Sequence, residues 1–162
     1  MNYTEALKWN RLAADQGYAS AQASLGTLYG NGYGTPQNYS EALKWRRLAA
    51  DQGDLLAQTS LGVMYSDGLG VPQDYAEALK WLSLAADRGD ADAQTLLGFM
   101  FEQGTGVPQN YVRAHMWFNL SAARGNTTAI GPRNTVASRM TAAQIAEAQK
   151  LAADWKPTST QR

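Results

Sequence analysis

The sequence predicts an all-α fold in which copies of a 36-residue helix pair stack along the chain. Three residue types recur every 36 positions without a slip: Tyr3, Tyr39, Tyr75 and Tyr111; Trp9, Trp45, Trp81 and Trp117; Gly17, Gly53, Gly89 and Gly125. A fixed period of about 20 to 50 residues is typical of stacked supersecondary units, which bury their cores between neighbours.

The amino-acid composition excludes several kinds of partner and binding site. The chain has 162 residues, 14 basic and 14 acidic, so its net charge is zero and no overall field attracts nucleic acid or an anionic membrane. It has no cysteine, which excludes disulfides and thiolate sites. No apolar run reaches the roughly 18 residues of a membrane span, and the N-terminus lacks signal-peptide features. We expect no membrane insertion; the compartment stays open, cytoplasmic or, for a fragment, periplasmic or secreted.

The first predicted helix covers residues 2–15. Asn2 stands at its N-cap with Glu5 three residues later, the spacing of a capping box, and Gly17 provides the C-terminal stop. The same spacing recurs later in the chain, with the glutamate lost from the last copy: Asn38 with Glu41, Asp74 with Glu77, and Asn110 with Arg113.

A second helix is predicted after each glycine, over residues 18–29, 54–65 and 90–101. Each contains an Ala-Gln pair and then Leu-Gly, with the glycine at 26, 62 and 98. Glycine inside a helix costs about 1 kcal/mol relative to alanine, so these positions indicate crossings where a neighbouring helix leaves no room for a Cβ. Glycine-rich loops ending at Pro36, Pro72 and Pro108 then lead to the next N-cap.

The recurring motif is Leu-Gly-x-x-Tyr, Gly-x-Gly-Val-Pro, then Asp-Tyr-x-x-Ala-x-x-Trp-x-x-x-Ala-Ala-x-x-Gly. It resembles the Sel-one-like repeat family, a branch of the tetratricopeptide-repeat superfamily with bacterial and eukaryotic members. The resemblance implies a right-handed α/α solenoid in which the Leu-Gly helix comes first in each repeat. Residues 1–162 would then form a single repeat domain: an unpaired second helix at 2–17, which suggests a fragment of a longer array, and full repeats at 18–53, 54–89 and 90–125.

The fourth unit departs from the pattern. Gly131-Pro132 interrupts its first helix, so we expect a kink or a start near Pro132. Thr141 with Gln144 gives a capping box that opens a last helix ending near Trp155. Residues 126–155 are therefore predicted to be a degenerate repeat and C-terminal cap, followed by a frayed tail at 156–162.

No catalytic, metal or cofactor site is predicted. The glycine-rich loops lack the Gly-Lys-Ser/Thr ending and preceding strand of a phosphate loop. His115, the one histidine, stands where leucine occurs at 7, 43 and 79, on a packing face. The aligned tryptophans lie beside small alanines, which favours core packing over a stacking ladder for ligands.

Partner binding is expected where the first helices differ between repeats. The superfamily resemblance places ligand-facing positions on the concave side of these helices, at two, five, nine, twelve and thirteen residues into the motif. In this chain they are Ser20, Ala23, Thr27, Gly30 and Asn31; Leu56, Thr59, Val63, Ser66 and Asp67; and Asp92, Thr95, Phe99, Glu102 and Gln103. Drift on an exposed surface would also produce such differences.

The leading hypothesis is a non-enzymatic interaction scaffold that holds a peptide or protein segment in the concave groove. Asp67, Asp92 and Glu102 would favour a basic or amide-rich ligand. Two alternatives stay open. A cysteine-rich branch of the family is linked to β-lactam binding and hydrolysis, but its repeats carry cysteine pairs that this chain lacks. The chain could instead be a structural spacer of a longer protein.

Overall fold

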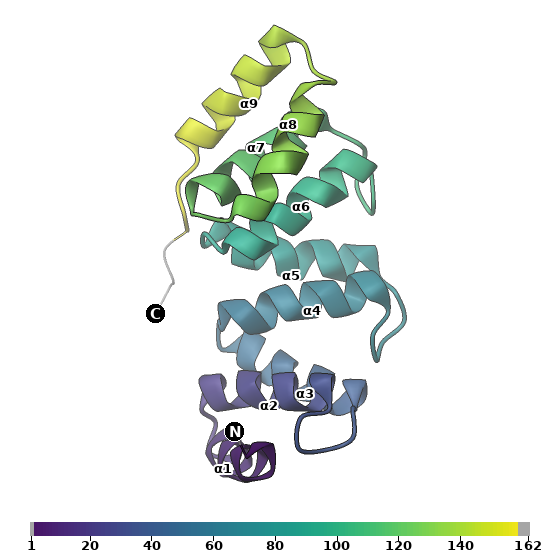
Figure 1. Ribbon diagram of the computed structural model, residues 1–162, viewed down its shortest axis with the longest axis vertical. Coiled ribbons are helices and arrows are strands. Elements are labelled where there is room, and N and C mark those ends of the chain that lie inside the picture. Colours follow the sequence, from purple (N-terminus) through teal and green to yellow (C-terminus); the bar gives the residue numbers. More distant parts are fainter. Residues whose placement is uncertain (1, 159–162) are drawn as a thin grey trace. The chain divides into compact units, whose positions relative to one another are not determined.

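The computed structural model describes residues 2–158, and within them every regular element is helical. The helices are α1 (Tyr3–Asp15), α2 (Ala19–Asn31), α3 (Tyr39–Asp51), α4 (Leu55–Asp67), α5 (Tyr75–Asp87), α6 (Ala91–Gln103), α7 (Tyr111–Ala123), the 3-10 turn η1 (Thr127–Ala129), α8 (Ile130–Ala137) and α9 (Ala142–Asp154) (Figure 1). Successive helix pairs begin 36 residues apart, so the predicted all-α repeat fold is confirmed. We call α2, α4 and α6 the A helices and α1, α3, α5 and α7 the B helices.

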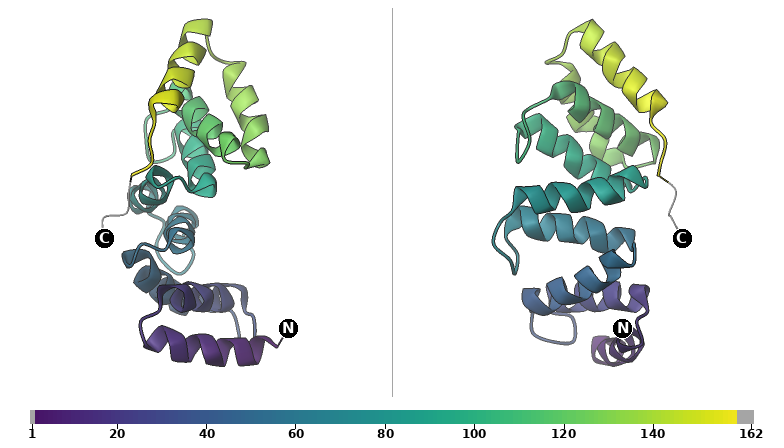
Figure 2. Two further views of the ribbon diagram at one scale, coloured as in Figure 1. Left: turned by 90° about the vertical axis from the view of Figure 1, so that its left-hand side faces the viewer. Right: turned by 180° about the vertical axis from the view of Figure 1, so that it is seen from behind.

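The chain forms two compact units that meet inside α5. Unit 1 runs from Met1 to Trp81 and unit 2 from Leu82 to Arg162. In unit 1, α2 packs against α1 on one side and α3 on the other, and α3 packs against α4. In unit 2, α7 packs against α6, α8 and α9, and α7 and α9 lie side by side in the separate views of Figure 2.

The B helices begin with half of the predicted capping box. At the start of α3, the Asn38 side chain accepts a hydrogen bond from the Glu41 backbone N–H at 3.0 Å. The return bond is replaced, because the Asn38 backbone N–H donates to the Tyr29 carbonyl at 2.8 Å and ties the B helix to the preceding A helix. The Glu41 carboxylate accepts instead from Trp45 Nε1 at 3.1 Å. A complete capping box occurs among the described residues at the start of α9, as predicted.

The A helices extend two residues beyond the predicted ends. They end at Asn31, Asp67 and Gln103 instead of at the aromatic residues 29, 65 and 101. Gly32, Gly68 and Gly104 then adopt positive φ values of 70°, 70° and 73° and stop each helix in the left-handed conformation.

The tryptophans of α3, α5 and α7 are core residues, as predicted, and the prediction is wrong for Trp9. Trp45, Trp81 and Trp117 are 4%, 7% and 9% exposed, whereas Trp9 on α1 is 64% exposed. In unit 1, Trp81 packs in a cluster with alanines of α3 and α4 and with Leu61.

The tight helix crossing predicted at the Leu-Gly glycines is also confirmed. A Cβ added at Gly98 on α6 would lie 2.5 Å from Cε1 of Phe118 on α7. One added at Gly26 on α2 would lie 2.5 Å from Arg46 Cγ and 3.3 Å from the Ala42 carbonyl oxygen on α3.

After α7, the described residues contain η1, α8 and α9. Helix α8 begins at Ile130, so Pro132 lies in its first turn, where the missing N–H removes no helical hydrogen bond. After α9, the Thr158 backbone N–H donates to the Asp87 carbonyl at 2.7 Å. Residues 159–162 of the predicted tail lie outside the described residues.

Candidate functional site

The expected partner-binding positions differ in their exposure. Ala23, Thr59 and Thr95, one from each A helix, are buried at 7% exposure. These three side chains therefore serve mainly in packing. The other positions retain accessible surface, with the exception of the buried Gly30: Ser20, Thr27, Asn31, Leu56, Val63, Ser66, Asp67, Asp92, Phe99, Glu102 and Gln103.

In unit 2, several of the expected positions already have partners within the chain. The Asp92 carboxylate accepts from Asn126 Nδ2 at 2.9 Å, and Glu102 lies 3.9 Å from Arg139. Phe99 packs edge-on against Phe118, with ring centroids 5.1 Å apart. The first two contacts tie α6 to the C-terminal segment. Two of the three carboxylates expected to bias the surface toward basic ligands are thus engaged internally.

In unit 1, the structure brings expected positions from two A helices together. Asn31 at the end of α2 and Thr59 and Val63 on α4 line one pocket of about 290 Å³. We call it the Arg46 pocket, after the α3 residue that enters it. Its lining is Gly30, Asn31, Gln37, Tyr39, Arg46, Thr59, Ser60, Val63, Met64 and Leu69.

Arg46 reaches the Arg46 pocket along a trough of glycines. Its stem lies over Gly26, where a Cβ would come within 2.5 Å of Arg46 Cγ, and its Nη2 would stand 3.2 Å from a Cβ at Gly30, a tight approach. Its Nη1 donates to the thioether sulfur of Met64 at 3.3 Å, a weak acceptor. The described residues provide no carboxylate within ion-pair distance of this guanidinium. Burial lowers the pKa of Arg46, and Tyr39 opposes that effect.

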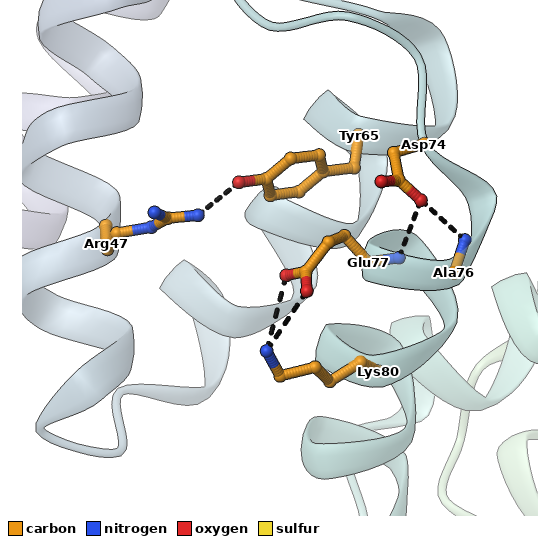
Figure 3. Close-up of polar contacts among 6 residues, drawn as sticks. All are labelled: Arg47, Tyr65, Asp74, Ala76, Glu77 and Lys80. Carbon is orange, nitrogen blue, oxygen red and sulfur yellow. Dashed lines mark hydrogen bonds and ion pairs between the residues drawn. The ribbon is translucent and has the colours of Figure 1, made fainter.

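The neighbouring arginine behaves differently. Arg47 projects from α3 to the hydroxyl of Tyr65 on α4, and its guanidinium lies 5.9 Å from the centre of that ring (Figure 3). Arg47 therefore joins two helices outside the pocket, while most N–H groups of Arg46 have no acceptor among residues 2–158.

Sequence reasoning missed Arg46, although the repeat register marks it. The residues 36 apart at this position are Asn10, Arg46, Leu82 and Phe118. Leu82 and Phe118 are 2% and 0% exposed, so the position belongs to the core in the later repeats. A cation at a position that packs apolar side chains in the two later repeats is the signal that could have found the pocket.

His115 lies in the core, as its register position predicts. It is 5% exposed, and the described part of the chain gives its Nδ1 no hydrogen-bond partner. Burial and the nearby charge of Arg133 lower its pKa, so the neutral ring is favoured. Among residues 2–158, no group of three His, Cys, Asp or Glu side chains is placed to hold a metal ion.

Within the same residues, none of the helices combines the length and apolar character needed to cross a membrane.

Comparison with known proteins gives a family and a fold. The sequence model of the Sel1 repeat matches residues 2–18, 19–54, 55–90 and 91–126. A crystal structure of a Sel1 repeat protein from Oxalobacter formigenes is 34% identical, covers 94% of this chain and has a TM-score of 0.71. The structure of c5321, a protective antigen of uropathogenic Escherichia coli strains with an SLR fold, is 28% identical, covers 92% of this chain and has a TM-score of 0.71.

The chain spans 55% and 40% of the lengths of those two proteins. A comparison with curated protein sequences gives no match.

Proposed function

This chain belongs to the Sel1 repeat family, and from that membership we propose that it is a non-enzymatic scaffold that binds a peptide or protein segment along its A helices. Sel1 repeat proteins generally act as protein-interaction scaffolds and are typically non-enzymatic.

The observation that carries the proposal is the Arg46 pocket. It draws Asn31 from α2 and Val63 from α4 to one depression, so a bound segment would contact two successive A helices at once. Its walls combine apolar side chains with side-chain amides and hydroxyls, the mixture that fixes both affinity and orientation in binding sites. Because rigid helices hold these groups in place, binding requires little ordering of the protein.

The proposed contact surface continues along α4. Leu56, at 61% exposure, is a large apolar side chain open to a partner, and Asp67 is exposed at the other end of the helix. These positions and the pocket together span the length of α4, which suits an extended segment. In unit 2, the proposed contact surface consists of Gln103 and the accessible part of the Phe99 side chain.

A selection from a random dodecapeptide library against the full chain tests this proposal. Peptides recovered by selection are resynthesised with a fluorophore, and binding is measured by anisotropy for the native protein and for Val63→Arg. The matched control is Leu48→Arg on α3, a position 42% exposed and outside the proposed surface. We expect Val63→Arg to abolish binding and Leu48→Arg to preserve it, with unchanged circular dichroism for both.

Binding lost in Leu48→Arg and kept in Val63→Arg would instead place the partner on the outer side of α3. A shallow apolar pocket lined by Leu43 and Leu48 lies there, so this is the specific rival surface.

A further inference from the structure

The Arg46 pocket has a property that a general peptide-binding surface does not require. Among its lining residues Arg46 is the one charged side chain, and no Asp or Glu contributes to the walls. The remaining polar side chains are the amides of Asn31 and Gln37 and the hydroxyls of Tyr39, Thr59 and Ser60. The Gln37 amide already donates to the Gly30 carbonyl at 2.8 Å and to the Tyr39 hydroxyl at 3.0 Å. The lining therefore offers a positive charge beside the Asn31 amide and the hydroxyls of Tyr39 and Ser60, with no competing negative charge.

The guanidinium has unused hydrogen-bonding capacity. A guanidinium carries five N–H donors in a planar fork, and Arg46 gives one of them to a sulfur atom. Partial burial of a charge without an opposite charge is unfavourable, and leucine and phenylalanine fill the same register position at 82 and 118. Packing alone therefore gives no reason for arginine at this position.

The glycines that Arg46 lies against, Gly26 and Gly30, support a dedicated role for this arginine. Gly30 corresponds to Ser66 and Glu102 in the following repeats, so the repeat with the arginine also has the smallest residue facing it. A Cβ at position 30 would lie 3.2 Å from Arg46 Nη2, so a side chain there would displace the guanidinium from its present place.

We propose that the Arg46 pocket is a subsite for a single carboxylate group of the bound peptide, held by the guanidinium of Arg46. The fork of an arginine matches the two oxygens of a carboxylate. One cation without a second basic residue suits a monoanion better than a doubly charged phosphate. Val63, Met64 and Leu69 would contact the carbon atoms next to the carboxylate. This inference rests on the proposed function and, for this pocket, reverses the expectation of a basic ligand.

The carboxylate could come from the C-terminus of a peptide or from a glutamate side chain. Two small probes separate these sources: N-acetyl-leucine, which carries a terminal carboxylate, and N-acetyl-glutamic acid α-methylamide, which carries a side-chain carboxylate. N-acetyl-leucine amide is the uncharged control.

The test follows arginine side-chain Nε–Hε signals by nuclear magnetic resonance while each probe is added to the full chain at constant ionic strength. The signal lost in Arg46→Leu identifies Arg46. We expect a saturable shift of this signal with at least one carboxylate probe, and affinity for the amide at least about tenfold weaker, because a charge-assisted hydrogen bond is lost. The Arg47 signal, whose guanidinium lies outside the pocket, should not saturate.

Equal response of Arg46 to the amide and to both carboxylates, or no saturation with any probe, would overturn the subsite. If the carboxylate probes bind but the peptide library yields no ligand, the subsite stands and the proposed scaffold function fails. If library peptides bind equally well to the native protein and to Arg46→Leu, the scaffold stands and the subsite fails. Thermal melting of Arg46→Leu, expected at or above the native temperature, confirms that this variant folds.

Discussion

The substitution Gly98→Ala tests the helix crossing on which the repeat packing depends. The added Cβ would lie 2.5, 2.6 and 2.9 Å from Cε1, Cδ1 and Cζ of Phe118. The Phe118 side chain is 0% exposed and packs against Phe99, so it has no open space into which to move. The Cβ must therefore force α6 and α7 apart.

Two opposing effects set the magnitude. Overpacking a filled core costs about 1–3 kcal/mol. Replacing a helical glycine by alanine gains about 1 kcal/mol. The net loss in the free energy of unfolding is then up to about 2 kcal/mol. Gly131→Ala provides the control, because it also lies in a helix but its Cβ would meet no atom within 4 Å outside its chain neighbours and its own helix backbone. That variant should gain less than about 1 kcal/mol, because its Cβ precedes Pro132 and a proline disfavours the helical conformation of the residue before it.

Urea denaturation followed by circular dichroism measures both variants. We expect Gly98→Ala to be less stable than Gly131→Ala by up to about 3 kcal/mol, most of it the cost of overpacking. Gly98→Ala should also cost less in a Phe118→Leu background, where the smaller side chain leaves room. A Gly98→Ala protein as stable as the Gly131→Ala protein would refute the crossing.

Three further results are expected. Trp81→Ala should lower the free energy of unfolding by about 3–5 kcal/mol because a large core side chain is removed. Trp9 is 64% exposed, so Trp9→Ala should change the free energy of unfolding by less than about 0.5 kcal/mol. Equal effects of the two substitutions in urea denaturation would contradict the core packing of Trp81. The pKa of His115 is lowered in the folded state. Its contribution to the stability of the fold is therefore present above about pH 6.5 and is lost as the pH falls through the lowered pKa. Melting temperatures at pH 7.5 and pH 5 should differ less for His115→Leu than for the native chain. Thr141→Ala removes the N-cap of α9 and should cost about 1 kcal/mol, seen as faster hydrogen exchange in α9 than in α3.

The sequence was informative about the fold because the residues that form the core recur at the same position of each repeat. The spacing of Trp45, Trp81 and Trp117 predicted both the 36-residue unit and the burial of these side chains. The capping boxes were predicted incompletely, because sequence spacing cannot show that the Asn38 N–H already donates to the Tyr29 carbonyl of the preceding helix.

The candidate site was less accessible to sequence reasoning. A motif position taken from a superfamily does not report burial, which is why Ala23 and Thr95 were expected on the surface and lie in the core. Arg46 was overlooked because the amphipathic pattern of α3 leaves arginine unremarkable. Its meaning depends on the trough that Gly26 and Gly30 form on another helix.

The most direct measurement on the proposed function is photo-crosslinking of a selected peptide that carries a benzophenone, followed by mass spectrometry of the crosslinked residues. Crosslinks at Asn31, Val63 and other lining residues of the Arg46 pocket are expected, because the peptide should lie against α2 and α4. Crosslinks concentrated at Leu43 and Leu48 on the outer side of α3 would contradict binding along the A helices.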